Sequence, residues 1–215
     1  SKEQQRKLVE DASHELRTPL TSLRTNIEVL LRAPTMEPAQ QAEILADAKS
    51  EIEELGILVV ELVELATATS RHEEPFASVD LGDVVEGAVQ RFRRRTKRDI
   101  SITIEGDNIR EIRTSGIDRA VGNLIENAIK FSPEGQGIEV RVEDGRVAIR
   151  DYGPGISEDD KSRVFDRFFR ATNTRSMSGS GLGLSIVAEI IRGHGGEVFV
   201  EDPPEGSGTV IGFRL

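Results

Sequence analysis

One histidine of the chain is followed directly by a carboxylate inside a stretch with helical periodicity, Asp11–Leu20. At about 100° per residue, the apolar residues of this stretch form one stripe, and His14 lies nearly opposite to it. Thr18 lies one turn further along on the same outward face, because residues i and i+4 are neighbours on a helix. An outward histidine can serve as a nucleophile, but a lone one is more often a solvated surface residue. The stretch alone leaves both interpretations open.

Three polar residues of a second helical stretch, 118–131, gather on one edge of the predicted helix. Asn123, Asn127 and Lys130 are spaced i, i+4 and i+7 and lie within about 40° of one another on the helical wheel. Amide oxygens suit Mg²⁺, and an ammonium group balances the charge of phosphate. This edge could bind a magnesium polyphosphate, although an ordinary polar helix face has the same pattern.

Two glycine-containing stretches follow further along the chain. Asp151 comes at the end of a predicted strand, together with Gly153 and Gly155, and a buried carboxylate there can accept a hydrogen bond from an exocyclic amine. The stretch 179–184 opens a predicted helix, whose N-terminal N–H groups form an anion site. It matches neither a Walker loop nor a dinucleotide fingerprint. Arg170, which precedes a polar Gly/Ser-rich segment, could reach a phosphate. Taken singly, these stretches also fit turns and linkers.

The candidate residues lie in two parts of the chain with different predicted structure, a helical part followed by a part with both helices and strands. Residues 2–32 and 38–69 are predicted to form two long helices, and the second carries a regular heptad whose apolar seam is too wide for two helices to bury. We therefore expect two hairpins to dimerise into a four-helix bundle. Pro19 predicts a kink at the turn that carries His14. After a non-periodic segment, Thr69–Val79, helices are expected at 81–97, 118–131, 158–169 and 182–193, with strands at 100–105, 138–142, 147–150, 197–201 and 209–215.

Composition narrows the class of protein. The net charge of −10 argues against general nucleic-acid binding, so the basic run Arg91–Arg98 is interpreted as the solvated end of a helix. Cysteine is absent, which excludes disulfides and thiolate metal sites. No apolar run approaches the ~20 residues that span a bilayer. Because the chain begins within a helical pattern and without Met, we expect an excised fragment whose upstream part is missing.

The order and spacing of these stretches together resemble the catalytic core of an orthodox, HisKA-type sensor histidine kinase of a two-component system. The resemblance covers essentially all 215 residues. The matching boxes are the H box His14–Leu20, the N box Asn123–Phe131, the G1 box Asp151–Gly155, the F box Phe165–Phe169 and the G2 box Gly179–Leu184. It implies a multi-domain chain: a dimerisation and histidine-phosphotransfer hairpin at 1–70, a linker at 71–78, and an ATP-binding α/β sandwich of the Bergerat type at 79–215.

The resemblance implies roles for residues of the hairpin. His14 matches the phosphoacceptor nucleophile, which becomes a phosphohistidine. Glu15 matches the residue that assists as a base by engaging the other nitrogen of the imidazole. Thr18 matches the residue that positions water in the reverse, phosphatase reaction.

The resemblance also implies the residues that bind ATP. Asn127 matches the Mg²⁺ ligand with Asn123 as its helper, Lys130 faces the phosphates, and Asp151 reads the adenine amine. Gly153 and Gly155 shape the adenine pocket, and Phe131 stands where a tyrosine is common, so a ring contact is kept and a hydroxyl is lost. The phosphate end comprises Arg170, a lid at about 171–178, and the hinge Gly179, Gly181, Leu182 and Gly183.

The implied activity is ATP- and Mg²⁺-dependent autophosphorylation of His14, followed by transfer to an aspartate on a separate response regulator. The implied partners are a second copy of the chain and that receiver domain, with no nucleic acid. The implied place is the cytoplasmic side of the membrane, which the chain meets only through absent upstream segments. Two alternatives stay open: a nucleotide-gated or phosphatase-dominant scaffold, and an anti-sigma-type protein kinase, which the histidine box disfavours. His72 is interpreted as solvated, and His194 as a capping or packing residue.

Overall fold

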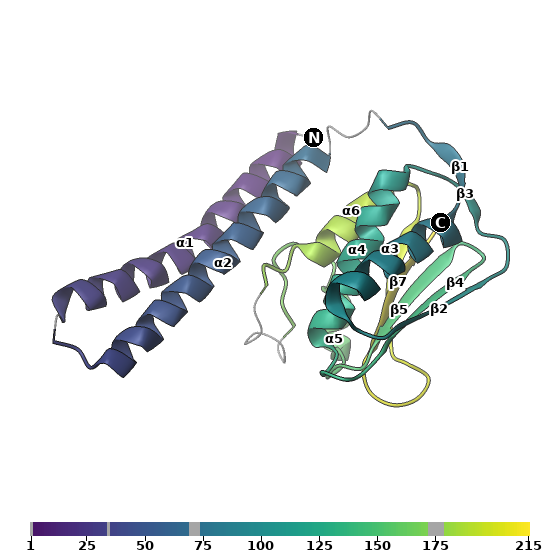
Figure 1. Ribbon diagram of the computed structural model, residues 1–215. Coiled ribbons are helices and arrows are strands. Elements are labelled where there is room, and N and C mark those ends of the chain that lie inside the picture. Colours follow the sequence, from purple (N-terminus) through teal and green to yellow (C-terminus); the bar gives the residue numbers. More distant parts are fainter. Residues whose placement is uncertain (1, 34, 69–73, 172–178) are drawn as a thin grey trace. The chain divides into compact units, whose positions relative to one another are not determined.

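The chain folds into two compact units, each described by itself (Figure 1). The structure, a computed structural model, describes residues 2–33, 35–68, 74–171 and 179–215. The first unit is a hairpin of two helices, α1 (Lys2–Arg32) and α2 (Pro38–Ala68), as the heptad pattern predicts. Pro38 begins α2 at the position where a missing N–H breaks no hydrogen bond. Pro19 lies inside α1, which continues as a helix on both sides of it.

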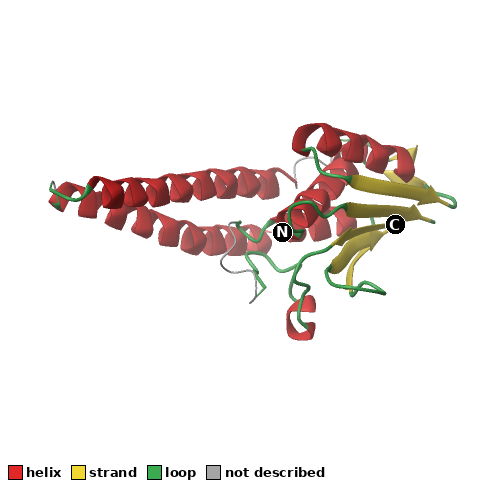
Figure 2. Ribbon diagram, turned by 60° about the horizontal axis from the view of Figure 1, so that its bottom comes forward, coloured by secondary structure: helices red, strands yellow, loops and turns green. Residues whose placement is uncertain are grey.

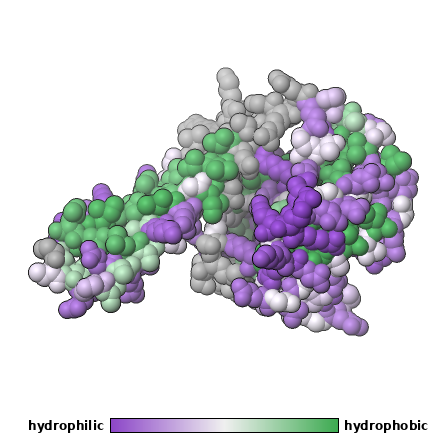
Figure 3. Space-filling view, viewed as in Figure 1, coloured by the Kyte–Doolittle hydropathy of each residue, from purple (hydrophilic) through white to green (hydrophobic). Residues whose placement is uncertain are grey.

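The hairpin buries only part of its apolar surface. Ala48 and Leu58 of α2 are buried, with exposed fractions of 8% and 6%. Other large apolar side chains stay about half exposed, and Figure 3 shows hydrophobic residues gathered over the hairpin. They include Leu20, Ile27, Leu45, Ile52, Val59 and Val60. One hairpin therefore leaves much of the wide seam uncovered, as the sequence pattern predicts.

The second unit is an α/β sandwich with helices on one side of a sheet (Figure 2). The five-stranded sheet has the order β2-β4-β5-β7-β6, in which β2 and β4 are parallel and the other neighbours are antiparallel. Its strands are β2 (Ile100–Glu105), β4 (Ile138–Glu143), β5 (Arg146–Asp151), β6 (Glu197–Glu201) and β7 (Thr209–Arg214). The helices are α3 (Leu81–Thr96), α4 (Thr114–Phe131) and α6 (Gly183–Gly193). Their apolar faces and the sheet form one core.

Several elements differ from those predicted. Strands β1 (Ala77–Asp80) and β3 (Ile109–Ile112) pair antiparallel in a separate two-stranded sheet, and neither was predicted. The helix predicted at 158–169 is wrong beyond its first turn, because α5 covers only Glu158–Lys161. The chain then turns: the N–H groups of Arg163, Asp166 and Phe169 each bond to the carbonyl three residues back. Phe168 has a positive φ of 61°, which ends any regular helix there.

The basic run Arg91–Arg98 lies at the end of α3 and holds the neighbouring helix. The side chains of Arg91 and Arg95 form ion pairs with Asp118 and Glu126 of α4. The guanidinium of Arg93 donates to the carbonyl of Ile100 at 2.8 Å, at the start of β2. The run therefore lies at a helix end, as predicted, where several of its arginines also contact α4 and β2.

The N-terminus of α4 is capped by a residue that precedes β1. The N-cap residue Arg113 supplies no side-chain bond to the helix. Instead, both carboxylate oxygens of Glu74 accept from the N–H of Ser115 at 3.3 Å, and the Ser115 hydroxyl donates to the same carboxylate. The hydroxyl bond, together with backbone N–H groups of this turn, lowers the pKa of Glu74. The cap is completed by the Arg113 Nε, which donates to the Glu74 carbonyl at 2.8 Å.

His194 joins the end of α6 to the same region. Its Nε2 accepts from the N–H of Arg113 at 3.0 Å, and its Nδ1 lies 2.7 Å from the carbonyl of Ile190. Its ring packs edge-on against Phe76 with centroids 5.3 Å apart. The predicted packing role of His194 is thereby confirmed, whereas His72 lies outside the described residues.

Candidate functional site

The three candidate residues of the hairpin are exposed on α1. His14, Glu15 and Thr18 all face solvent, so the outward position inferred from the helical wheel is confirmed for His14. Within the described part of the chain, the side chains of His14 and Glu15 have no hydrogen-bond or ion-pair partner. The contact expected between the Glu15 carboxylate and the imidazole is not formed in this structure and stays a prediction.

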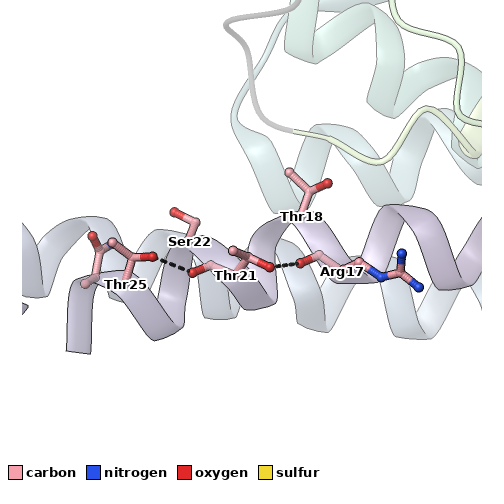
Figure 4. A pocket seen from close by; sticks show the side chains of 6 residues that line it. Arg17, Thr18, Thr21, Ser22 and Thr25 are labelled. Atoms are coloured by element: carbon pink, nitrogen blue, oxygen red, sulfur yellow. Dashed lines mark hydrogen bonds between the residues drawn. The ribbon is translucent and has the colours of Figure 1, made fainter. Parts of the chain in front are cut away.

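An open pocket lined by residues of polar type lies one turn beyond His14 along α1 (Figure 4). It has a volume of about 430 Å³ and is lined by Arg17, Thr18, Thr21, Ser22, Thr25 and Asn26. The hydroxyls of Thr21 and Thr25 donate to carbonyls one turn back, those of Arg17 and Thr21, at 2.8 and 2.9 Å. The Thr18 hydroxyl has no such bond to the described residues. Thr18 thus differs from Thr21 and Thr25, whose hydroxyls are bonded to their own helix.

In the α/β unit the candidate site is built around a buried carboxylate at the end of β5. Asp151 is 4% exposed, and burial raises its pKa above the ordinary value. Its Oδ1 accepts from the N–H groups of Gly153 at 2.8 Å and Thr209 at 3.2 Å, which act in the opposite direction on the pKa. Because both bonds use Oδ1, the second oxygen is left to accept from a ligand.

Two buried hydroxyl residues beside Asp151 were not predicted as part of the site. Ser132 is 5% exposed, and its Oγ accepts from the N–H of Tyr152 at 3.1 Å. Thr209 is 3% exposed and donates its N–H to Asp151. The signal that could have indicated Thr209 is the run Gly206-Ser-Gly208-Thr209 before the last strand. A Cβ at Gly208 would lie 1.9 Å from the Asp151 carbonyl, so only glycine permits this close approach.

Close backbone contacts also explain the predicted glycines. A Cβ at Gly153 would lie 2.7 Å from the carbonyl of Phe131, so the end of α4 lies directly against the turn after Asp151. Gly155 has a φ of 77°, in the left-handed region that favours glycine, and lies beside the Gly208 carbonyl. The structure therefore places the end of α4 at Phe131 against the turn that follows Asp151, and their service in one adenine pocket stays a prediction.

The polar edge of α4 carries an unsatisfied buried atom. The Nδ2 of Asn123 is buried and has no hydrogen-bond partner among the described residues. The Asn123 Oδ1 lies 3.8 Å from where a Cβ at Gly183 would stand, so the start of α6 faces this side chain. Asn127 is half-buried, and the exposed Lys130 has its Nζ 5.1 Å from the Phe131 ring centroid. An orphaned amide beside a glycine fits a polar ligand between α4 and α6.

The donor set limits which metal could bind there. In the described ranges, no group of three or more His, Cys, Asp or Glu side chains could hold a metal ion. The available ligands at the α4 edge are amide oxygens of Asn123 and Asn127, which suit a hard cation such as Mg²⁺ that also binds phosphate oxygens. The residues therefore fit Mg²⁺ carried by a polyphosphate better than a metal held by the protein alone.

The segment between β5 and α6 carries the remaining predicted residues. Phe165 packs partly buried against the core, and Arg167 pairs with Glu189 of α6 at 3.0 Å. Arg170 is half-buried, and most of the predicted lid, 172–178, lies outside the described residues. Gly179 and Gly181 have φ values of 138° and 74°, which favour glycine, and Leu182 is fully buried.

Two family models match the two units. The His Kinase A (phospho-acceptor) domain matches residues 4–71, and the histidine kinase-, DNA gyrase B-, and HSP90-like ATPase model matches residues 112–215.

Among the described residues, a search for membrane-spanning helices finds none with the length and hydropathy that a span requires.

Relatives with high sequence similarity bear the name signal transduction histidine-protein kinase/phosphatase MprB. The protein from Mycobacterium avium is 41% identical over 223 residues, covering 96% of this chain and 41% of the relative. That from Mycobacterium leprae is 40% identical, with 96% and 41% covered. The chain thus spans about 41% of the length of these curated relatives.

Solved structures agree with both units. A mycobacterial sensor histidine kinase MprB is 38% identical with a TM-score of 0.55, covering 65% of this chain and 96% of that one. The histidine kinase AdeS of Acinetobacter baumannii covers 94% of this chain and 96% of its own with a TM-score of 0.64. At 23% identity, AdeS supports the fold alone.

Proposed function

Because the chain belongs to the HisKA-type sensor histidine kinases of two-component systems, we propose that it phosphorylates its own His14 from ATP. The phosphoryl group then passes to an aspartate of a response regulator. The observation that carries this proposal is the combination, in one chain, of a solvent-facing histidine and a buried carboxylate with one oxygen free. The histidine is a nucleophile without a competing partner, and the carboxylate is an acceptor for a base amine.

The α/β unit is proposed to bind ATP with its adenine at Asp151. The free oxygen of Asp151 accepts from the exocyclic amine, while Gly153 and Gly155 let the backbone approach the base. Ser132 and Thr209 keep the carboxylate and its turn in place through the bonds described above. A buried, charged acceptor discriminates strongly, because a base that offers no donor leaves the carboxylate unpaired in an apolar site.

The triphosphate is proposed to extend from Asp151 along the polar edge of α4. Asn127, helped by Asn123, would hold Mg²⁺, and Lys130 and Arg170 would balance phosphate charge. The backbone of Gly179, Gly181, Leu182 and Gly183 precedes or opens α6, where N–H groups and the helix dipole favour an anion. Mg²⁺, when bound, would neutralise the charge that develops between the β- and γ-phosphates.

At the hairpin, a ring nitrogen of His14 attacks the γ-phosphorus in line. The N–P bond forms as the bond from phosphorus to the bridging oxygen breaks, and ADP leaves. Glu15 is proposed to bond to the other ring nitrogen, which fixes the tautomer and takes up the proton. Positioning of the two reactants contributes most of the acceleration, so the two units must meet during the reaction.

Three further points belong to the proposal. A second copy covers the exposed apolar residues of the hairpin to form a four-helix bundle. Thr18 positions water for the reverse dephosphorylation of the regulator, in keeping with its free hydroxyl. The hairpin is proposed to span residues 1–70. The predicted linker, 71–78, overlaps Glu74 and β1, which belong to the α/β unit, so the ATP-binding unit is proposed to begin before Glu74 rather than at residue 79. The parent protein is proposed to hold this part on the cytoplasmic side of a membrane.

The test is incubation of the chain with γ-labelled ATP and Mg²⁺. We expect an acid-labile, base-stable label on the wild type and none on His14→Gln. Label that persists on His14→Gln would mean that another residue is the nucleophile. Binding of ATP without any label on the wild type would favour a nucleotide-gated scaffold, and label on the serine of an added partner would favour an anti-sigma-type kinase.

A further inference from the structure

The end of helix α4 nearest to Asp151 is held by a single guanidinium. Arg98 follows α3 after Lys97, whose positive φ of 55° turns the chain toward β2. Its Nη2 donates to the carbonyls of Ser132 at 2.7 Å and Ile129 at 3.1 Å. Its Nη1 donates to the carbonyl of Pro133 at 2.7 Å and, more weakly, to that of Gln136 at 3.4 Å.

This arrangement replaces a cap that α4 lacks. The last carbonyls of a helix have no partner within the helix, and many helices use a left-handed glycine to satisfy them. Here the C-cap residue Ser132 has an extended backbone, with φ −72° and ψ 134°, and its N–H satisfies only the carbonyl of Ala128. The planar fork of Arg98 comes from a different element and supplies donors to two further carbonyls of this end, those of Ile129 and Ser132. Its positive charge suits the C-terminal end of the helix dipole.

The turn that Arg98 holds also lies against the proposed adenine site. Ser132, whose carbonyl it binds, accepts the N–H of Tyr152 on its hydroxyl. The preceding carbonyl, that of Phe131, lies against Gly153 so closely that a Cβ would come within 2.7 Å. Tyr152 and Gly153 directly follow Asp151, and Gly153 donates to its carboxylate. The chain of contacts therefore runs from Arg98 through the turn to the acceptor of the base.

We propose that Arg98 is a positioning residue for nucleotide recognition, which fixes the turn 131–133 and thereby the direction in which the Asp151 carboxylate faces the adenine amine. This inference rests on the proposed function. It predicts that loss of Arg98 affects recognition of the base more than transfer of the phosphoryl group. Asn123 and Asn127 precede the end of α4 that Arg98 holds, and Arg170 and residues 179–183 lie on another segment, so Lys130 is the one proposed phosphate residue beside the turn.

The experiment compares Arg98→Met, Arg98→Lys and a matched control, Arg94→Met, in the same basic run. Arg94 is exposed on α3, so its loss removes the same charge without touching the turn. The probes are ATP and ITP, whose base carries a carbonyl in place of the adenine amine. Affinities are measured by equilibrium titration well below each melting temperature, and autophosphorylation rates are measured at saturating ATP.

For the wild type we expect ATP to bind about tenfold or more tightly than ITP, the range of one hydrogen bond to a charged group. In Arg98→Met this ratio should fall to about threefold or less, with the rate at saturating ATP within about twofold. Lysine should restore part of the ratio, because its ammonium can serve fewer carbonyls than the fork. Arg94→Met should keep the wild-type ratio.

Two results would overturn the inference: an unchanged ratio in Arg98→Met, or an equal loss of affinity for both nucleotides, which a merely loosened fold would give. If Arg98→Met does not fold, an unchanged ratio in Arg98→Lys decides against it. A wild type that binds neither nucleotide, or does not distinguish them, would instead refute the proposed adenine site.

Discussion

Replacing Asp151 by Asn should weaken ATP binding without weakening the fold. The amide keeps an oxygen for the N–H groups of Gly153 and Thr209, which both bond to Oδ1. It replaces the second oxygen by an NH₂ group, which meets the adenine amine donor to donor. A hydrogen bond to a charged group contributes about 1.5–3 kcal/mol, so the affinity for ATP should fall about 10- to 150-fold. ITP, which offers an acceptor, should lose much less affinity.

The Asp151→Asn substitution should leave the free energy of unfolding unchanged or raise it, although it weakens ATP binding. Burial raises the pKa of Asp151, because the charged carboxylate is less stable in the folded protein than in water. Ionisation of Asp151 therefore destabilises the folded state. The free energy of unfolding of the wild type therefore decreases as the pH rises from the unfolded value, 3.8, through the raised folded pKa. Asn lacks this cost, and the variant should be at least as stable as the wild type at pH 7. The difference should vanish below the unfolded pKa.

Nucleotide titrations and thermal unfolding between pH 3 and pH 8, roughly the range that brackets the carboxylate pKa values, measure both effects. A variant that keeps the wild-type preference for ATP over ITP would show that Asp151 does not read the base. A variant that loses several degrees of melting temperature at pH 7 would show that the carboxylate is needed for folding, and the reasoning about its free oxygen would fail.

Three other perturbations give separate predictions. Thr18→Ala should keep autophosphorylation and slow dephosphorylation of the regulator. The control, Thr21→Ala, removes a hydroxyl already bonded to its own helix and should leave both activities unchanged. Equal losses of both activities in Thr18→Ala would show that Thr18 has a packing role instead. Ile52→Glu places a charge on a side chain that is 56% exposed in one hairpin, and light scattering should show monomers, whereas persistent dimers would refute the proposed seam. Glu74→Gln weakens the cap of α4 and should cost about 0.5–2 kcal/mol in chemical unfolding at neutral pH; because the pKa of Glu74 is lowered on folding, this difference should disappear as the pH falls through the folded value.

Elements with a clear hydrophobic period or turn motif in their own residues could be predicted from the sequence. Both helices of the hairpin follow the predicted bounds closely, and the turn at Asp144 and Gly145 joins β4 to β5 with two positive φ values, as a tight hairpin requires. Strand β1 lacked such a signal because three of its four residues are exposed, so its polar pattern resembles a linker. Its pairing with β3 depends on contacts across about thirty residues of chain, which no local pattern records.

The same distinction holds within the site. Asp151 could be predicted because its type and its place after a strand carry the chemistry. Ser132 and Thr209 are small residues in turns, and their place beside Asp151 follows only from burial and the register of β5 with β7. The start of α4 at Thr114, four residues before its predicted start at Asp118, depends on the distant carboxylate of Glu74.

The distant cap of α4 sets a practical border for exchanging modules. The ATPase model begins at residue 112, inside β3. A fragment cut there would lose β1, β2 and α3, and with them fully buried side chains such as Leu81, Val85 and Ile100. It would also lose Glu74, and α4 would begin without its cap. Anyone joining this catalytic module to a foreign sensor should therefore make the junction before Glu74, so that the few residues ahead of β1 travel with the nucleotide site.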